Sequence, residues 1–478
     1  MSGVNWWSIA PLLVLSGGAV LLMLVVSARR DTGLAWITTV LVLAAAALSC
    51  LGARQAIPQA VTPLLLADGY ALFFSALFTS CGLVTVIVAR EYLAQRVGQN
   101  EEFFLLLLLS TLGASTLAYA NHFASLLLGM ELLGVSLYAL IGYPDRLELP
   151  LEAAIKYLVL SAAASATFLF GFALLYAAVG TLDYPGIGRA LASEDSPVLL
   201  AAAAMIVAGL GYKLSAVPFH MWTPDVYQGA PAPIAGFLAA VSKGAIFAAL
   251  LRWWMASGLY DLPGLLTLVA LVAGASMLVG NLLALLQDNI KRMLAYSSIA
   301  HMGYLLIVLV ACGLAPNPDL AKEAAIYYLV AYTVTNLAAF TLLGLLSRAS
   351  GAIELDSLDD MNGLFWRQPG LSLLFTVALL SLAGIPLTAG FIGKFYLFSA
   401  GVAGSLWGLL ALLVIGSAIG VFYYLRVIYR MTLAGEAHPA HVEQPGWAAR
   451  LTCYGLVLAM LYLGILPGPL MDMLRTIL

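Results

Sequence analysis

Four lysines, Lys156, Lys213, Lys243 and Lys394, lie inside long apolar stretches of this 478-residue chain. A lysine near the centre of a bilayer costs at least about 2.5–3.5 kcal/mol on insertion scales, so each one requires a partner, water or a function. Loss of hydration disfavours the charged form of a lysine, and a nearby carboxylate favours it again. These side chains are therefore candidates for groups that change charge state and exchange protons.

Glu131, in the segment Leu-Gly-Met-Glu-Leu-Leu-Gly, is the single carboxylate that we expect deep within an apolar helix. A buried carboxylate needs a cationic partner, and an intramembrane lysine is suitable. The alternative is a salt bridge that only joins two helices and has no part in transport.

Lys213 precedes Pro218 by five residues. Because proline removes an intrahelical hydrogen bond, it frees carbonyl groups that must find water or polar side chains. His220 and Asp225 follow in the same segment and are candidate relay groups. A simple proline kink, with the lysine extended towards the membrane surface, is the alternative.

Lys243 lies nine residues before Arg252, which two tryptophans follow in the manner of a helix end at the membrane interface. Nine helical residues rise about 13.5 Å, close to the half-thickness of about 15 Å of a hydrocarbon core. We therefore expect Lys243 near the bilayer midplane, where its side chain cannot easily reach the headgroups.

Lys394 lies eight residues after Pro386, in a second proline-interrupted span that is rich in glycine. Close packing of helices would also explain those glycines. Lys156 is near the start of its span and can extend to the surface, and His301 can be an ordinary hydrogen-bonded histidine. The hydroxyl groups around His301 could instead hold a chain of water.

The elements that carry these residues are membrane-spanning helices, because 63% of the residues are hydrophobic and only 9% are charged. Apolar runs long enough to cross about 30 Å of hydrocarbon follow one another along the chain. We expect an all-α polytopic protein with about fourteen crossings, at 9–27, 34–52, 70–89, 103–119, 122–142, 153–178, 197–217, 232–257, 263–286, 293–312, 324–347, 370–400, 404–430 and 452–470. The first run lacks a preceding basic segment and is interpreted as a retained helix.

Basic residues collect at one side of this arrangement, which identifies the cytoplasmic face. Twelve lie there and five on the other face, where we expect Arg54, Arg189, Arg252, Lys322 and Arg475. Both termini are then predicted on the periplasmic side.

An internal repeat is visible in the sequence. The octapeptide at 152–159 recurs at 323–330 with seven identities, and Pro218 and Pro386 are 168 residues apart. Glu131 precedes His301 by a similar 170 residues. Five crossings separate the two copies, so we expect two inverted five-helix repeats with discontinuous helices at the two prolines. The predicted units are 1–102, 103–257, 258–430 and 431–478, the last with a polar loop and the final helix.

The sequence contains no recognisable motif for binding a cofactor. The four cysteines are scattered, with no CxxC pair, and the chain has neither a phosphate-binding loop nor a dinucleotide fingerprint. We expect no bound cofactor, no metal and no nucleic-acid partner, so the energy source must lie in another protein.

The segments at 213–227 and 291–304, together with Gly-Ile-Pro before Lys394, resemble the antiporter-like subunits of proton-pumping NADH–quinone oxidoreductase, which are related to sodium/proton antiporter subunits. The similarity covers most of the chain. It implies that Glu131 pairs with Lys213, that Lys243 relays and that Lys394 faces the outer exit. The short C-terminus favours a family member without a long lateral helix.

The expected function is proton translocation in the membrane arm of respiratory complex I, in a bacterial inner membrane. Its partners would be neighbouring membrane-arm subunits, protons, internal water and lipids. A sodium/proton antiporter subunit is the first alternative, and a structural spacer that moves nothing is the second. Four intramembrane lysines argue against the spacer, because apolar residues would pack at lower cost.

Overall fold

The computed structural model describes residues 5–93, 100–144, 147–191, 196–349, 354–434 and 446–477. The secondary-structure elements within these residues are all helices apart from one small hairpin, β1 (Gln59–Thr62) and β2 (Leu65–Ala67). Thirteen of the described helices are long and apolar enough to cross a membrane, and two shorter ones, α16 (Pro369–Ala383) and α17 (Ala389–Ala403), follow one another as the halves of a further crossing. The predicted all-α polytopic fold is confirmed.

Three spans come before the first predicted repeat and one comes after the second. The N-terminal elements are η1 (Trp6–Ile9), α1 (Ala10–Ala28), α2 (Thr32–Ala53), η2 (Arg54–Ala56) and α3 (Gly69–Leu93). The C-terminal elements are α19 (Trp447–Ile465) and α20 (Gly468–Ile477). The predicted polar loop falls largely on residues 435–445, which lie outside the described residues.

The first predicted repeat holds α4 (Glu101–Tyr119), α5 (Phe123–Ile141), α6 (Glu148–Val179), α7 (Tyr184–Leu191), α8 (Pro197–Leu214), α9 (Trp222–Gly229), α10 (Ala232–Phe237), η3 (Leu238–Ser242), α11 (Lys243–Ser257) and η4 (Leu259–Asp261). The second holds α12 (Pro263–Leu285), α13 (Ile290–Leu314), α14 (Pro318–Ala349), η5 (Asp359–Met361), α15 (Leu364–Arg367), α16 (Pro369–Ala383), α17 (Ala389–Ala403) and α18 (Trp407–Thr432).

The two halves share an order of elements. Each contains a helix of 32 residues, α6 or α14, followed by a helix that is broken at a proline. The long helix packs against both parts of the broken one, α6 against α8 and α9, and α14 against α16 and α17. This order agrees with the repeat read from the sequence, whereas the exact unit boundaries and the inverted orientation stay predictions.

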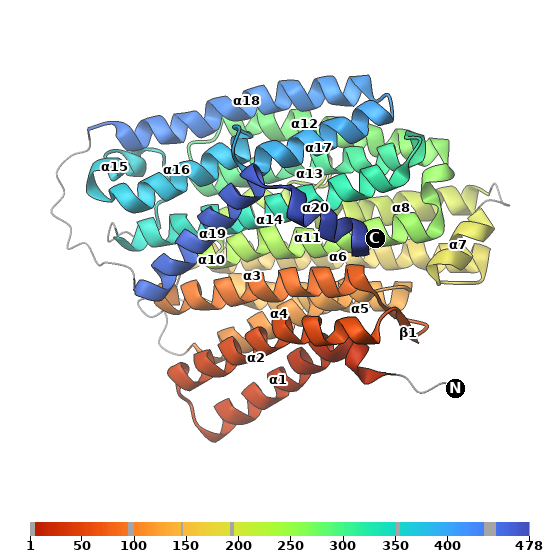
Figure 1. The fold of residues 1–478 in the computed structure, drawn as a ribbon, viewed down its shortest axis with the longest axis horizontal. Coiled ribbons are helices and arrows are strands. Elements are labelled where there is room, and N and C mark those ends of the chain that lie inside the picture. Colours follow the sequence, from red (N-terminus) through yellow and green to blue (C-terminus); the bar gives the residue numbers. More distant parts are fainter. Residues whose placement is uncertain are drawn as a thin grey trace.

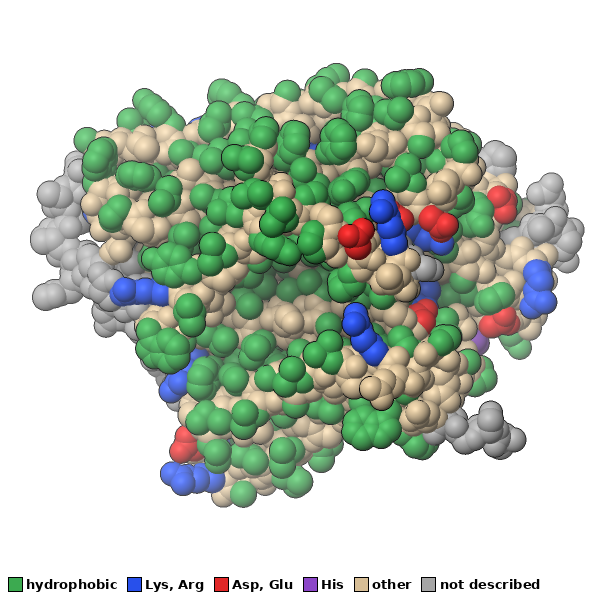
Figure 2. All heavy atoms as spheres, viewed as in Figure 1, with side chains coloured by type: hydrophobic (Ala, Val, Ile, Leu, Met, Phe, Trp, Pro, Cys, Tyr) green, Lys and Arg blue, Asp and Glu red, His purple; other side chains and the backbone are tan. Residues whose placement is uncertain are grey.

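Hydrophobic side chains cover the middle of the molecule, and charged side chains gather towards the two ends of the helices (Figure 2). The helices run roughly parallel to one another, and η1 and α20 lie towards the same end of the bundle (Figure 1). An even number of membrane crossings places both ends of the chain on the same side of the bundle. Which end faces the cytoplasm stays a prediction.

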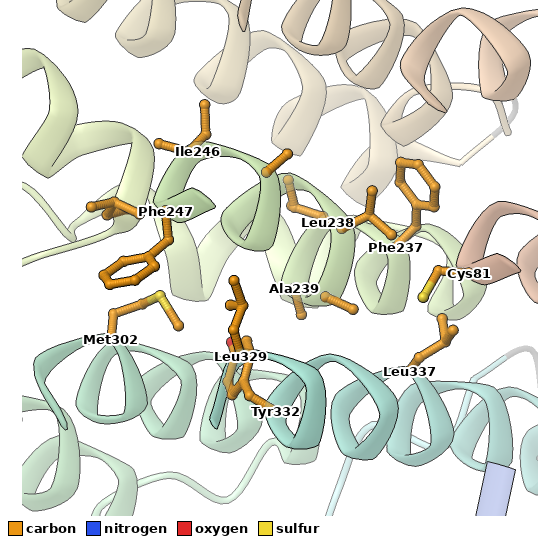
Figure 3. Packing of buried hydrophobic residues seen from close by; sticks show 14 of the residues in the cluster. Cys81, Phe237, Leu238, Ala239, Ile246, Phe247, Met302, Leu329, Tyr332 and Leu337 are labelled. Carbon is orange, nitrogen blue, oxygen red and sulfur yellow. The ribbon is translucent and has the colours of Figure 1, made fainter. Parts of the chain in front are cut away.

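The centre of the bundle is the α10–η3–α11 stretch, which is buried from Ala232 to Trp254. Leu329, Tyr332 and Leu337 of α14 point towards it, and Met302 of α13 packs beside Phe247 (Figure 3). Because this stretch has no lipid-facing side, a polar group on it is surrounded by protein on all sides.

Candidate functional site

Glu131 and Lys213 meet between α5, α6 and α8. Glu131 Oε1 lies 3.8 Å from Lys213 Nζ and accepts a hydrogen bond of 2.6 Å from Ser165 Oγ. The lysine is buried, whereas 36% of the Glu131 side chain is exposed on the outer side of α5. The lysine of this ion pair is therefore enclosed by protein, whereas the glutamate is partly exposed at the surface of the bundle.

Hydroxyl groups support the buried end of the pair. Lys213 Nζ donates to Ser161 Oγ at 2.9 Å, and Tyr138 OH donates to the same oxygen at 2.6 Å. Lys213 is the penultimate residue of α8, which ends because Ser215 adopts a left-handed conformation with φ 61°. The break before Pro218 thus holds the ammonium group close to α6.

Lys243 is completely buried and begins α11 directly after η3, a single π-helical turn. Such turns are rare and occur often at functional sites. Lys243 Nζ donates to Ser298 Oγ at 2.6 Å, and the Ser298 and Tyr332 hydroxyls lie 2.6 Å apart. These contacts join α11 to α13 and α14 through polar groups alone.

His301 lies one turn after Ser298 on α13, with its Nδ1 2.7 Å from Tyr328 OH. Its ring is 5.6 Å from that of Tyr332 and 5.5 Å from that of Tyr304, between ring centroids. The imidazole therefore lies between Tyr332, which belongs to the group of contacts around Lys243, and Tyr304 on the other side.

Lys394 occupies the second helix break. Its Nζ donates to the carbonyl oxygens of Leu382 at 3.1 Å and Ala383 at 2.9 Å, at the end of α16, and lies 5.5 Å from the Tyr304 ring centroid. A cation is favoured at the negative end of a helix dipole, where carbonyl groups lack intrahelical partners. Gly384, with φ 85°, ends α16 and leaves room for the lysine.

Polar and aromatic contacts connect these positions in one direction across the bundle. From Lys243 they pass through Ser298, Tyr332, His301 and Tyr304 to Lys394. Towards Lys213, the Tyr138 ring lies 5.1 Å from that of Tyr157, and the Tyr157 hydroxyl interacts with Ser242, the neighbour of Lys243. We call the whole set, from Glu131 to Lys394, the polar axis.

Lys156 and Asp225 lie apart from the polar axis. Lys156, 42% exposed, pairs with Glu152 at 2.7 Å and Asp225 at 2.8 Å, and Asp225 also pairs with Arg292 at 2.5 Å. The charges thus form a network between α6, α9 and α13. His220 lies buried in the turn after Pro218, and neither of its ring nitrogens has a hydrogen-bond partner among the described residues.

The hydroxyls near His301 in sequence were noted as candidates, whereas those of Tyr157, Ser161, Tyr328 and Tyr332 were missed, although the repeat contains a signal for them. The repeat offset of 171 residues relates Tyr157 to Tyr328 and Ser161 to Tyr332. All four contribute hydroxyl groups to the polar axis. A search for polar residues at repeat-related positions would have found them.

Among the residues that the structure describes, no group of three or more His, Cys, Asp or Glu side chains could hold a metal ion. The absence of a cofactor stays an expectation.

The fold and the buried charges define a class of protein, a polytopic helical membrane protein with ionisable groups along its interior. Residues 120–420 match the family model described as NADH:quinone oxidoreductase/Mrp antiporter, TM, and the chain belongs to this family.

Curated relatives agree with this membership. NADH-quinone oxidoreductase subunit N of Ectopseudomonas mendocina is 46% identical over 98% of this chain and 95% of its own. The subunit N of Methylococcus capsulatus is 47% identical over 97% and 94%. Subunit N is therefore the family member that this chain resembles, as the sequence predicted.

Solved structures share the fold. Respiratory complex I from Thermus thermophilus with bound aureothin contains a chain with a TM-score of 0.82 and 35% identity, over 97% of this chain and 98% of that one. The Mrp complex from Dietzia sp. has a TM-score of 0.84 at 19% identity, over 99% and 97%, and supports the fold alone.

Proposed function

We propose that this chain is a proton-translocating subunit of the membrane arm of NADH:quinone oxidoreductase, and that protons move along the polar axis. The coarser part, membership of the membrane arm, rests on the relatives named subunit N. The finer part, proton movement along the polar axis, rests on one observation. Hydroxyl and aromatic contacts link five ionisable residues that lie within or beside apolar spans: Glu131, Lys213, Lys243, His301 and Lys394.

In this proposal, the chain supplies proton-binding groups and no redox chemistry. A change in charge in a neighbouring subunit shifts the Glu131–Lys213 pairing, and this alters the proton affinity of Lys243 and then of Lys394. The exposed side of Glu131 suits that role, because Leu128 and Val135 on the same helix are also exposed and leave a surface for a partner. Lys394 would release protons to the periplasmic side of the bacterial inner membrane, where both termini would also lie.

The competing function is a subunit of a sodium/proton antiporter, which the shared fold and the family description both allow. The identity to subunit N relatives, 46–47%, against 19% for the Mrp chain favours the pump. Acidification of inside-out vesicles by NADH, with and without sodium, separates the two. The pump predicts equal rates, and the antiporter predicts none without a sodium gradient.

The test of the polar axis uses Glu131→Gln and Lys213→Met in the assembled complex. Both should lower the number of protons moved per NADH oxidised, because each removes one charge of the pair. Lys322→Met is the matched control, since Lys322 pairs with Asp319 near the end of a span. Full pumping in both Glu131→Gln and Lys213→Met would refute the proposal.

A further inference from the structure

A cavity of about 380 Å³ opens on the side of the bundle between α2, α3, α19 and α20, with Val330 of α14 also in its lining. Figure 2 shows it as a hollow between α3 and the α19–α20 pair, bounded by hydrophobic side chains. Its walls are the membrane-spanning helices α2, α3, α14 and α19 together with the short helix α20, so the cavity lies at the level of the hydrocarbon. An empty cavity there would leave apolar walls without contacts.

The cavity is elongated along the membrane normal. On α3 its lining extends from Gly69 to Ser80, and eleven helical residues rise about 16.5 Å. On the opposite wall the lining begins at Arg54 of η2, at the same end, and reaches inward along α2 to Ala47. This depth equals about half of a hydrocarbon core, which is the length of one lipid leaflet.

Arg54 is the one charged residue in the lining of this cavity, and it stands at the outer end. Of the cations at this end of the bundle, Arg252 pairs with Asp68, Lys322 with Asp319 and Arg475 with Glu323. Arg54 has neither an ion pair nor a side-chain hydrogen bond in the part of the chain that the structure describes. An unpaired arginine at headgroup level attracts an anion.

A second cavity, of about 280 Å³, lies beside the first at the end of the helices where the polar residues are found. It shares Ile477 with the cavity and is lined by Arg252 and Lys322, with Asp68 among them. Arg252 is buried, and its Nε has no acceptor within the described residues. Because Arg252 and Lys322 are already paired with carboxylates, Arg54 is the cation left for a ligand. The apolar cavity with Arg54 at its end therefore matches a molecule with a long apolar part and an anionic end.

We propose that this cavity binds one anionic phospholipid, with an acyl chain against α3 and its phosphate on Arg54. The occupant is a lipid and not another protein segment, because the lining is almost wholly apolar, is one leaflet deep and ends in a single unpaired cation. The site is independent of the polar axis and of the proposed function.

The experiment uses the assembled complex in nanodiscs that contain a phosphatidylglycerol carrying a photoactivatable group on its acyl chain. After illumination, labelled peptides from α3 and from α19–α20 are quantified by mass spectrometry. We expect Arg54→Gln to reduce this labelling about fivefold, the effect of one basic residue near a membrane surface. Arg54→Lys should retain it.

Two further variants separate the parts of the site. Ala76→Phe, which fills the cavity from α3, should abolish labelling with Arg54 intact. Arg29→Gln is the matched control, since Arg29 pairs with Asp31 at the far end of α1, and it should change nothing. A native gel verifies that every variant assembles.

Three results would overturn the proposal. Unchanged labelling in Arg54→Gln and Ala76→Phe means that the cavity holds no lipid. Equal labelling by a phosphatidylethanolamine probe means that the charge of the headgroup is not recognised. Cross-links from α3 to another subunit, in place of lipid, mean that a protein segment fills the cavity.

Discussion

Ser298 accepts a hydrogen bond from Lys243 and lies 2.6 Å from the Tyr332 hydroxyl, so one small side chain joins a buried cation to the next polar group. Hydrogen bonds to charged groups are worth about 1.5–3 kcal/mol, and a buried charge that loses one has no water to replace it. Several serines in these spans bond to a carbonyl of their own helix, whereas Ser298, like Ser161 and Ser165, connects one helix to another.

We expect Ser298→Ala to lower the rate of NADH-driven proton pumping at least tenfold, because Lys243 loses its acceptor and the contact to Tyr332. Proton uptake by reconstituted vesicles measures the rate. Ser399→Ala is the control, since the Ser399 hydroxyl is exposed and bonds to the carbonyl of Phe395 on its own helix. Equal rates in the two variants would exclude Ser298 from the proton path.

The neighbouring tyrosines Tyr327 and Tyr328 provide a matched pair. Tyr328 OH contacts His301 Nδ1, whereas Tyr327 OH donates to the backbone of Leu463 at 2.5 Å. We expect Tyr328→Phe to reduce pumping and to shift its pH profile, because the histidine loses the group that selects its tautomer. Tyr327→Phe should alter thermal stability alone. A pH profile unchanged in Tyr328→Phe would contradict the relay role of His301.

The broken helices are the elements that make intramembrane chemistry feasible. Each break exposes carbonyl groups in the interior of the protein, and a lysine or a polar side chain lies beside them. At the second break, Lys394 itself donates hydrogen bonds to the carbonyl oxygens of Leu382 and Ala383. At the first, the Tyr212 carbonyl accepts from the Trp222 indole at 3.0 Å, which leaves Lys213 for Glu131 and Ser161.

Gly384→Ala should disturb the second break in two ways. A left-handed conformation costs a residue with a side chain about 1–2 kcal/mol, and the added Cβ would lie 3.0 Å from Lys394 Cδ. We expect a lower thermal midpoint of the purified complex and slower pumping. Gly370→Ala, in the same helix with open space around it, should leave both unchanged or raise the midpoint slightly. A normal pumping rate in Gly384→Ala would mean that Lys394 does not need its present position.

At the scale of the whole molecule, one buried charge cluster joins segments that are far apart in sequence. Lys291 of α13 pairs with Glu354 and lies 3.6 Å from Asp356, and it donates to the Ala230 carbonyl at 3.1 Å. Glu354 also accepts from Tyr92 and from the Ala232 backbone at the start of α10. The cluster thus holds the link after α14 against the central α10–α11 stretch.

We expect Lys291→Met to lower the yield of assembled complex severely, because breaking a buried pair costs about 3–5 kcal/mol when the partner stays charged. The double variant Lys291→Met with Glu354→Gln should recover part of the loss, since no unpaired charge remains. Yield and thermal midpoint measure both. A double variant that is as unstable as the single one would show that the Ala230 contact, and not the ion pair, carries the stability.

The sequence by itself determined the number of crossings, the positions of the two breaks and the residues that are costly in lipid. Apolar runs reveal spans because their length must match the bilayer, and a lysine within such a run stands out against its neighbours. The same reasoning placed Lys156 with the other three, although its position near the start of a span already allowed its side chain to extend to the surface.

Only the tertiary structure decided which groups meet. Spans that are apolar on all sides have no periodicity that shows which face is turned inward, so the partners of Lys243 on α13 and α14 could not be identified from spacing. Asp225 likewise pairs with Arg292, 67 residues away, and not with a group on the polar axis. Contacts between helices depend on how the spans pack, and packing is a property of the assembled bundle.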